Sequence, residues 1–135
     1  MKAVIDTNVL LVANGQHPDI SEGCVKACIE HLQTMQAGGI TVIDDAYHIL
    51  GEYQHKTSIS PPKGVGDIFL KWLLRNVGNP RHVEHVSITE IEPERFAEFP
   101  DDELQQRFDA PDRKFPAVAN VHPEKPPIWL AADCK

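Results

Sequence analysis

Apolar residues along the chain alternate between short β-branched runs and helical spacings. Runs rich in valine and isoleucine, which are typical of buried strands, occur at 2–6, 40–43, 82–88 and 128–132. Apolar side chains recur every three or four positions, as on one face of a helix, over 22–36 and 67–76. Shorter helices are expected over 9–13, after Asp44-Asp45, and over 101–108 and 112–121. The polar segment 54–64, with its adjacent prolines, is predicted to be a loop.

Strands and helices alternate from one end of the sequence to the other. This order predicts an α/β fold, a three-layer α/β/α sandwich with a mainly parallel central sheet. The length of 135 residues suits a single domain over residues 1–135. Ligands of such folds bind at the carboxyl ends of the strands.

Composition narrows the function classes. The chain has 13 Lys and Arg against 20 Asp and Glu, a net charge of −7, so a broad electrostatic grip on nucleic acid is not expected. A nuclease is not excluded, because carboxylates gathered around a cation contribute to such an excess. Apolar runs reach only five residues, which predicts no membrane span and no signal peptide, and therefore a cytoplasmic protein.

Cysteines and histidines carry no pattern of a catalytic or metal site. Three cysteines do not make a disulfide framework, and Cys24 and Cys28 are expected to be buried thiols of a reducing compartment. Five scattered histidines are expected on the surface, namely His17, His31, His48, His55 and His122.

Two aspartates each follow a predicted strand. Asp6 comes after Ala-Val-Ile and Asp133 after Ile-Trp-Leu-Ala-Ala, so both are expected at the same edge of the sheet. Two neighbouring carboxylates raise each other's pKa unless positive charge lies between them, and a hard divalent cation with oxygen ligands is the usual solution. The alternative is that each aspartate simply caps the helix or turn that follows.

Four acidic residues occur in order in distinctive local contexts. These are Val4-Ile-Asp6-Thr-Asn-Val-Leu-Leu11, Ile49-Leu-Gly-Glu52-Tyr53, Asp112-Arg-Lys-Phe115-Pro-Ala117-Val-Ala119 and Ala131-Ala-Asp133. The order and contexts resemble those of PIN-domain nucleases. The resemblance implies a PIN-like fold in which Asp6, Glu52, Asp112 and Asp133 form the catalytic and metal-binding set. The loop 54–64 and the acidic stretch 90–103 carry no signature of that family.

The resemblance implies a site for Mg²⁺ or Mn²⁺. Such an ion lowers the pKa of a water, orients the phosphate and offsets negative charge. Asp6 and Asp112 are expected to bind it directly, and Glu52 and Asp133 directly or through water.

Several neighbours of these acids are candidates for supporting roles. Thr7 or Asn8 could orient a ligand or phosphate oxygen. Arg113 and Lys114 are either phosphate contacts or solvated surface charges. Pro116 is tolerated only near the first turn of a helix, which favours a helix starting near Asp112 and leaves Asp109 as a loop acid.

The expected function is a metal-dependent endoribonuclease acting on single-stranded or structured RNA. In the family that the chain resembles, many proteins of this size are toxins of toxin–antitoxin pairs, so a small antitoxin and a homodimer are expected partners. A catalytically inactive PIN-like binding or scaffold module is the alternative. A metal-dependent phosphatase or DNA nuclease with the same carboxylate cage is a third reading.

Overall fold

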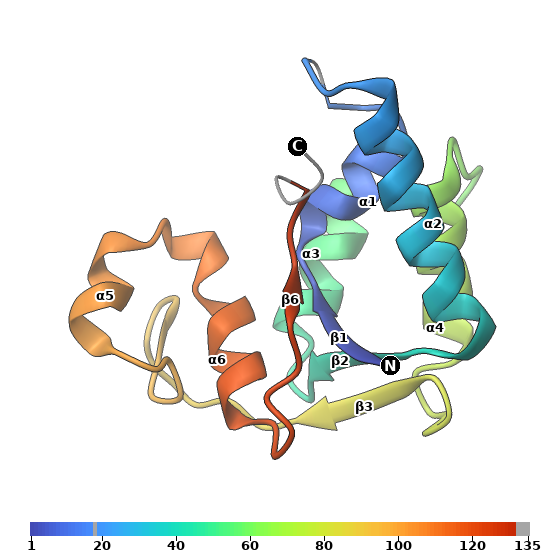
Figure 1. Cartoon of the computed structure of the whole chain (residues 1–135). Coiled ribbons are helices and arrows are strands. Elements are labelled where there is room, and N and C mark those ends of the chain that lie inside the picture. The colour runs from blue at the N-terminus through green and yellow to red at the C-terminus, as the bar shows by residue number, and fades with distance from the viewer. Residues whose placement is uncertain (18, 132–135) are drawn as a thin grey trace.

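The computed structural model describes residues 1–17 and 19–131. Its centre is a four-stranded, wholly parallel sheet in the order β3-β2-β1-β6 (Figure 1). The strands are β1 (Lys2–Ile5), β2 (Ile40–Asp44), β3 (Val83–Val86) and β6 (Ile128–Trp129). Lys2 pairs with Ile40, Val4 with Ile128, and Thr41 with Val83. The prediction of an α/β fold with a parallel sheet is confirmed.

Helices cover both faces of the sheet (Figure 1). On one face α1 (Thr7–Ala13), α2 (Glu22–Gly38) and α4 (Val65–Arg75) pack against one another. On the other face α6 (Lys114–Val121) packs against β1 and β2, while α3 (His48–Lys56) contacts β2, α1 and α6. Burial between two layers explains why residues 3–5 and 41–44 have no exposed surface and why residues 3–5 and 42–43 are apolar without alternation.

Side-chain caps begin several of the helices. Asp6 accepts a hydrogen bond from the Asn8 amide at the start of α1, and Ser21 accepts one from Cys24 at the start of α2. Asp44 accepts from the amides of His48 and Ile49 at 2.8 and 2.9 Å and so caps α3. These side chains satisfy amides that have no partner within the helix.

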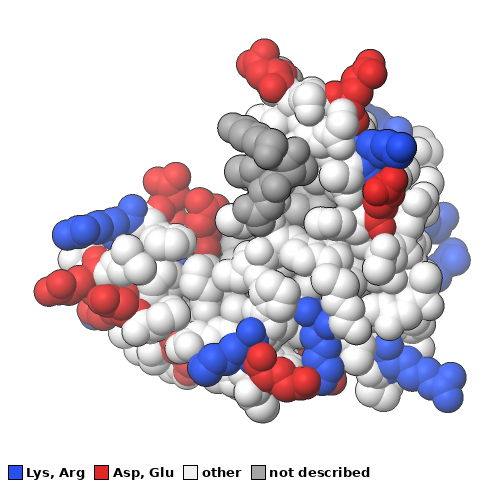
Figure 2. Space-filling model, in the orientation of Figure 1, with Lys and Arg blue, Asp and Glu red and all other residues white. Residues whose placement is uncertain are grey.

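The acidic stretch after β3 contains an antiparallel hairpin that the sequence did not indicate. Its strands are β4 (Glu90–Glu92) and β5 (Arg95–Phe96), followed by α5 (Asp102–Arg107). All three residues of β4, Glu-Ile-Glu, are exposed, and a run of three residues is too short to indicate a strand by its alternation. Charged side chains of both signs are interspersed over the face drawn in Figure 2.

Two predicted elements end or begin elsewhere. The helix expected from Asp112 begins at Lys114, after the 3₁₀ turn η1 (Ala110–Asp112), which makes Pro116 its third residue. A proline there displaces no intrahelical hydrogen bond, because the amides of the first turn have no partner. The last strand ends at Trp129, and residues 132–135 lie outside the described part.

The structure corrects two expectations about single side chains. Cys28 is a buried free thiol as predicted, but Cys24 is disulfide-bonded. His122 is only 5 % exposed and His48 is half-buried, so neither is the surface histidine that was expected. Within residues 1–17 and 19–131, no helix has the length and apolar character of a membrane span.

A buried aspartate holds the predicted loop 54–64 against the core, although α3 extends into it as far as Lys56. Asp67 is 1 % exposed and accepts hydrogen bonds from Asn14 Nδ2 at 2.8 Å, from the Ser58 amide at 3.1 Å and from the Lys63 amide at 2.8 Å. In return, its own amide donates to Asn14 Oδ1 at 2.9 Å. A Cβ on neighbouring Gly66 would collide with the Leu10 carbonyl oxygen, so glycine permits this close approach of α4 and α1.

Replacement of Asp67 with alanine should destabilise the protein strongly. The substitution removes the acceptor of three part-buried donors, of which Asn14 Nδ2 also donates to Gln16 Oε1, and each unmet donor costs on the order of 1 kcal/mol. We expect Asp67→Ala to lower the free energy of unfolding by about 2 kcal/mol in urea titrations. Exposed Glu30 on α2 provides the control, and Glu30→Gln should change it by less than about 0.5 kcal/mol. Equal effects of the two substitutions would contradict this role for Asp67.

Candidate functional site

Three of the predicted site acids line one cavity at the carboxyl edge of the sheet. Asp6 directly follows β1, and its amide donates to the Trp129 carbonyl at 3.0 Å. The cavity, which we call the acid cavity, has a volume of about 220 Å³ and is lined by Asp6, Thr7, Asn8, Leu11, Glu52, Lys56, Pro111 and Asp112. Its acids come from the β1–α1 junction, from α3 and from η1, segments far apart in sequence.

Asp6 is the most buried of these acids. Only 9 % of the residue is exposed, and Oδ2 accepts from the Asn8 amide at 3.2 Å. The pKa of Asp6 is raised from 3.8 to about 6, mainly by burial and also by the charges of Asp112 and Glu52. The Asn8 hydrogen bond and Lys114 oppose this rise. The carboxylate is therefore held in a place where additional positive charge would be favourable.

Glu52 is paired on both of its oxygens. Thr7 Oγ1 donates to Oε2, and Lys114 Nζ donates to Oε1 at 2.9 Å. The side chain of Lys114 is 8 % exposed and that of Glu52 is 18 % exposed, and Lys114 also donates to the Pro111 carbonyl. The reading of Lys114 as a solvated charge is wrong. It is a buried ammonium bound to Glu52.

Asp112 enters the cavity from η1. Partial removal from water raises the pKa of its carboxyl, as do the charges of Asp109 and Glu52, while Lys114 lowers it. Asp109 itself is exposed and does not line the acid cavity. Of the two aspartates considered as site residues from the sequence, Asp112 therefore lines the acid cavity and Asp109 does not.

The remaining predicted residues have different positions. Thr7 is buried against Glu52, and Asn8 is exposed at the cavity wall. Arg113 donates to the carbonyls of Phe108 at 3.2 Å and Glu94 at 3.4 Å, so its guanidinium ties η1 to the hairpin. Asp133, expected as the fourth acid, lies outside the described residues.

The acid cavity opens toward a larger apolar one. That neighbour, of about 390 Å³, shares Asp6, Asn8 and Asp112 and continues along Phe108, Phe115 and Leu130. Asp6 and Asp112 thus stand where the two cavities meet. A ligand with an anionic or metal-binding group and an apolar part matches this combination.

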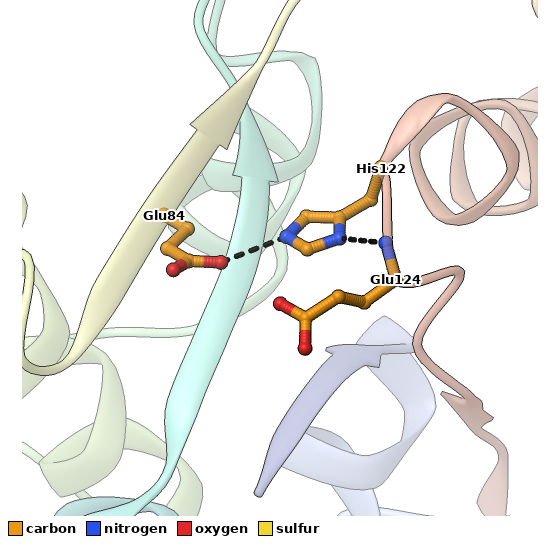
Figure 3. Close-up of side chains that lie close together, drawn as sticks. All are labelled: Glu84, His122 and Glu124. Carbon is orange, nitrogen blue, oxygen red and sulfur yellow. Dashed lines mark hydrogen bonds and ion pairs between the residues drawn. The ribbon is translucent and has the colours of Figure 1, made fainter.

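A tighter group of potential metal ligands lies elsewhere, at Glu84, His122 and Glu124 (Figure 3). Within the described residues, only these donor atoms form a set of three that all lie within 4.8 Å of one another. His122 Nδ1 accepts from the Glu124 amide at 3.0 Å, so Nε2 carries the proton that it donates to Glu84 at 2.7 Å. Nε2 then has no lone pair for a metal.

Lys2 supplies the cation of this second group. Its ammonium lies 3.1 Å from Glu84 and is paired with Glu124. The hydrogen bond from His122 and the contacts with Lys2 lower the pKa of Glu84. We therefore describe the group as an ion-pair cluster that ties β1, β3 and the end of α6 together.

Comparisons with protein-family profiles, curated proteins and solved structures found no significant match to the chain.

The raised pKa of Asp6 predicts a pH dependence of stability. Between pH 4 and pH 6.5 the unfolded chain releases this proton before the folded one, so Asp6 destabilises the fold as pH rises through that window. One pKa unit corresponds to about 1.4 kcal/mol. In EDTA, Asp6→Asn, which retains a capping side chain, should unfold like the wild type at pH 4. At pH 7.5 it should be more stable by on the order of 2–3 kcal/mol.

Urea titrations at both pH values measure this difference. Glu30→Gln is the control, because its exposed side chain should give the same small change at each pH. A difference between Asp6→Asn and wild type that does not grow with pH would contradict the raised pKa of Asp6.

The buried ion pair gives a second stability prediction. Lys114→Gln leaves the Glu52 carboxylate without its cation, and breaking such a pair costs about 3 kcal/mol when it is buried. We expect the variant to unfold at a clearly lower temperature in EDTA and to recover most of that loss in millimolar Mn²⁺. Lys71→Gln, an exposed change on α4, should show neither effect. No recovery with Mn²⁺ would argue against a cation replacing Lys114 beside Glu52.

Proposed function

We propose that the protein is a PIN-like, metal-dependent endoribonuclease. The observation that carries the proposal is the convergence of Asp6, Glu52 and Asp112 on one cavity at the carboxyl edge of a parallel sheet. This is the edge at which α/β folds bind ligands. Removal from water and the charges of neighbouring carboxylates raise the pKa of buried Asp6 and of Asp112, which favours a cation between them.

The donor set suits a hard divalent ion. Asp6 and Asp112 would hold Mg²⁺ or Mn²⁺ directly, since Mg²⁺ needs only one or two protein carboxylates and keeps several waters. Glu52, with both oxygens engaged by Thr7 and Lys114, would act through a water. When bound, the ion would activate a water and offset charge on the phosphate.

The chain's own residues would position the strand. Asn8, exposed at the wall between the two cavities, would donate to a phosphate oxygen. Phe108 and Phe115 line the apolar cavity, where a nucleobase could stack. Cavities of this size accept one strand more readily than a duplex, which favours single-stranded or looped RNA.

An inactive binding module is the second candidate, and one observation favours it. Lys114 already supplies a buried positive charge to Glu52, so part of the charge balance is met without metal. An antitoxin partner, a homodimer and a cytoplasmic location extend the nuclease proposal and depend on it.

Cleavage of end-labelled RNA tests the proposal. We expect cleavage with Mn²⁺ or Mg²⁺ and none in EDTA. Asp6→Asn and Asp112→Asn should each reduce the rate at least 100-fold, because each removes a direct metal ligand. Asp109→Asn is the matched control, since this exposed aspartate on the same turn does not line the acid cavity, and it should retain activity within about threefold.

Binding measured in parallel separates the two candidates. RNA that binds but is not cleaved with either metal, by a folded protein, would favour the binding module. Cleavage that persists in Asp6→Asn would contradict the assigned site. Equal losses in Asp109→Asn and Asp112→Asn would contradict the assignment of Asp112 as a direct metal ligand.

A further inference from the structure

A second polar cavity adjoins the acid cavity. It has a volume of about 340 Å³ and shares Glu52, Lys56 and Pro111 with the acid cavity. Two histidines of α3, His48 and His55, lie on its wall. We call it the histidine cavity. Because the two cavities share three residues, they lie side by side on the molecule.

His48 is held in one orientation by a buried carboxylate. Its Nδ1 lies 2.8 Å from Asp44 Oδ2, and Asp44 has no exposed surface. The same carboxylate accepts from the amides of His48 and Ile49. A carboxylate surrounded by donors acts as an acceptor, so Nδ1 carries a proton and Nε2 is the nitrogen that remains for a ligand.

The outer side of the ring has no short hydrogen bond among the described residues. Glu90 Oε1 lies 3.7 Å from Nε2, beyond hydrogen-bond range. The ring packs edge-on against Phe96 with centroids 5.4 Å apart, and its side chain remains 30 % exposed. The ring is therefore fixed on one side and accessible on the other.

Helix capping alone does not account for this arrangement. The cap of α3 uses the backbone amides of residues 48 and 49. Any residue other than proline at position 48 would supply that amide. The additional ring contact to a buried carboxylate is the arrangement that orients proton-transfer histidines in hydrolytic sites. Glu52 lies four residues further on, a rise of about 6 Å along the same helix.

We propose that His48 is the proton donor to the leaving oxygen in phosphodiester cleavage at this site, and that Asp44 is its positioning residue. The inference rests on the proposed nuclease function. In the step, a water oxygen forms the new bond to phosphorus and the bond from phosphorus to O3′ breaks. Nε2 of the protonated ring gives its proton to the departing O3′. The neutral ring then regains a proton from solvent, and the proton of the attacking water also passes to solvent.

The charged groups around His48 come from four segments. Asp44 faces Nδ1 from the end of β2, and Glu90 of β4 faces Nε2. The other titratable groups lining the histidine cavity are Glu52, His55, Lys56, Glu94 and Lys114. Of these, Lys114 is already paired with Glu52.

A sulfur-substituted substrate tests proton donation separately from folding and binding. The cleavage position of a short RNA is first mapped with wild-type protein and Mn²⁺. The same RNA is then made with a bridging sulfur in place of O3′ at that position. A thiol has a pKa of about 8.5, so the sulfur leaves without a proton, whereas an alkoxide needs one.

We expect His48→Gln and His48→Asn to cleave the oxygen-linked RNA at least 100-fold more slowly than wild type, as for loss of a general acid. Both should cleave the sulfur-linked RNA within about threefold of wild type. Asp44→Asn should show the same selective loss in weaker form. The control His31→Gln, an exposed histidine of α2 that lines neither the histidine cavity nor the acid cavity, should cleave both RNAs within about threefold of wild type.

Other outcomes overturn the proposal in distinguishable ways. Equal losses on both RNAs would assign His48 a structural or binding role, and no loss on either would remove it from the reaction. In both cases the nuclease function would stand. Wild-type protein that cleaves neither RNA with Mn²⁺ or Mg²⁺ would overturn the nuclease function and this inference with it.

Discussion

The ion pair between Lys114 and Glu52 is the contact on which the geometry of the acid cavity depends. Lys114 begins α6 and also binds the Pro111 carbonyl in η1, while Glu52 on α3 accepts from Thr7 on α1. One buried pair thus fixes the positions of four segments that pack around the edge of the sheet. It also places a positive charge near Asp6 and Asp112, where Lys114 partly offsets the rise in the pKa of both carboxyls.

Two aspartates at this end of the sheet also stabilise the fold by capping helices. Asp6 caps α1 and Asp44 caps α3, and each follows directly from a parallel strand or forms its last residue. Capping by a carboxylate stabilises a helix N-terminus. The same placement brings negative charge to the edge where ligands bind. The acidic excess of the chain is therefore compatible with a local cation site, although the net negative charge disfavours nonspecific electrostatic binding of nucleic acid.

The sequence predicted the parallel sheet and most of the helices because their apolar spacings are local. The resemblance to PIN-domain nucleases implied that Asp6, Glu52, Asp112 and Asp133 would come together. The structure brings the first three to one cavity, and Asp133 lies outside the described residues. The β4–β5 hairpin was missed because strands of three and two residues are too short to show a periodic pattern. The pairing of Lys114 with Glu52 joins positions 62 residues apart, and no local pattern marks such a contact. His48 was missed for the same reason: its burial depends on Phe96 and on the hairpin.

The position of Lys114 bears on how a cation would enter the site. Glu52 has no oxygen without a partner in the described structure, whereas Asp6 is engaged only by the Asn8 amide and Asp112 faces the opening between two cavities. An incoming ion would therefore meet Asp6 and Asp112 first. Glu52 could then either stay with Lys114 and act through a water, or release it. The first route leaves the four tied segments in place, so it requires less rearrangement of the fold, and it makes Lys114 a permanent part of the site rather than a substitute for the metal.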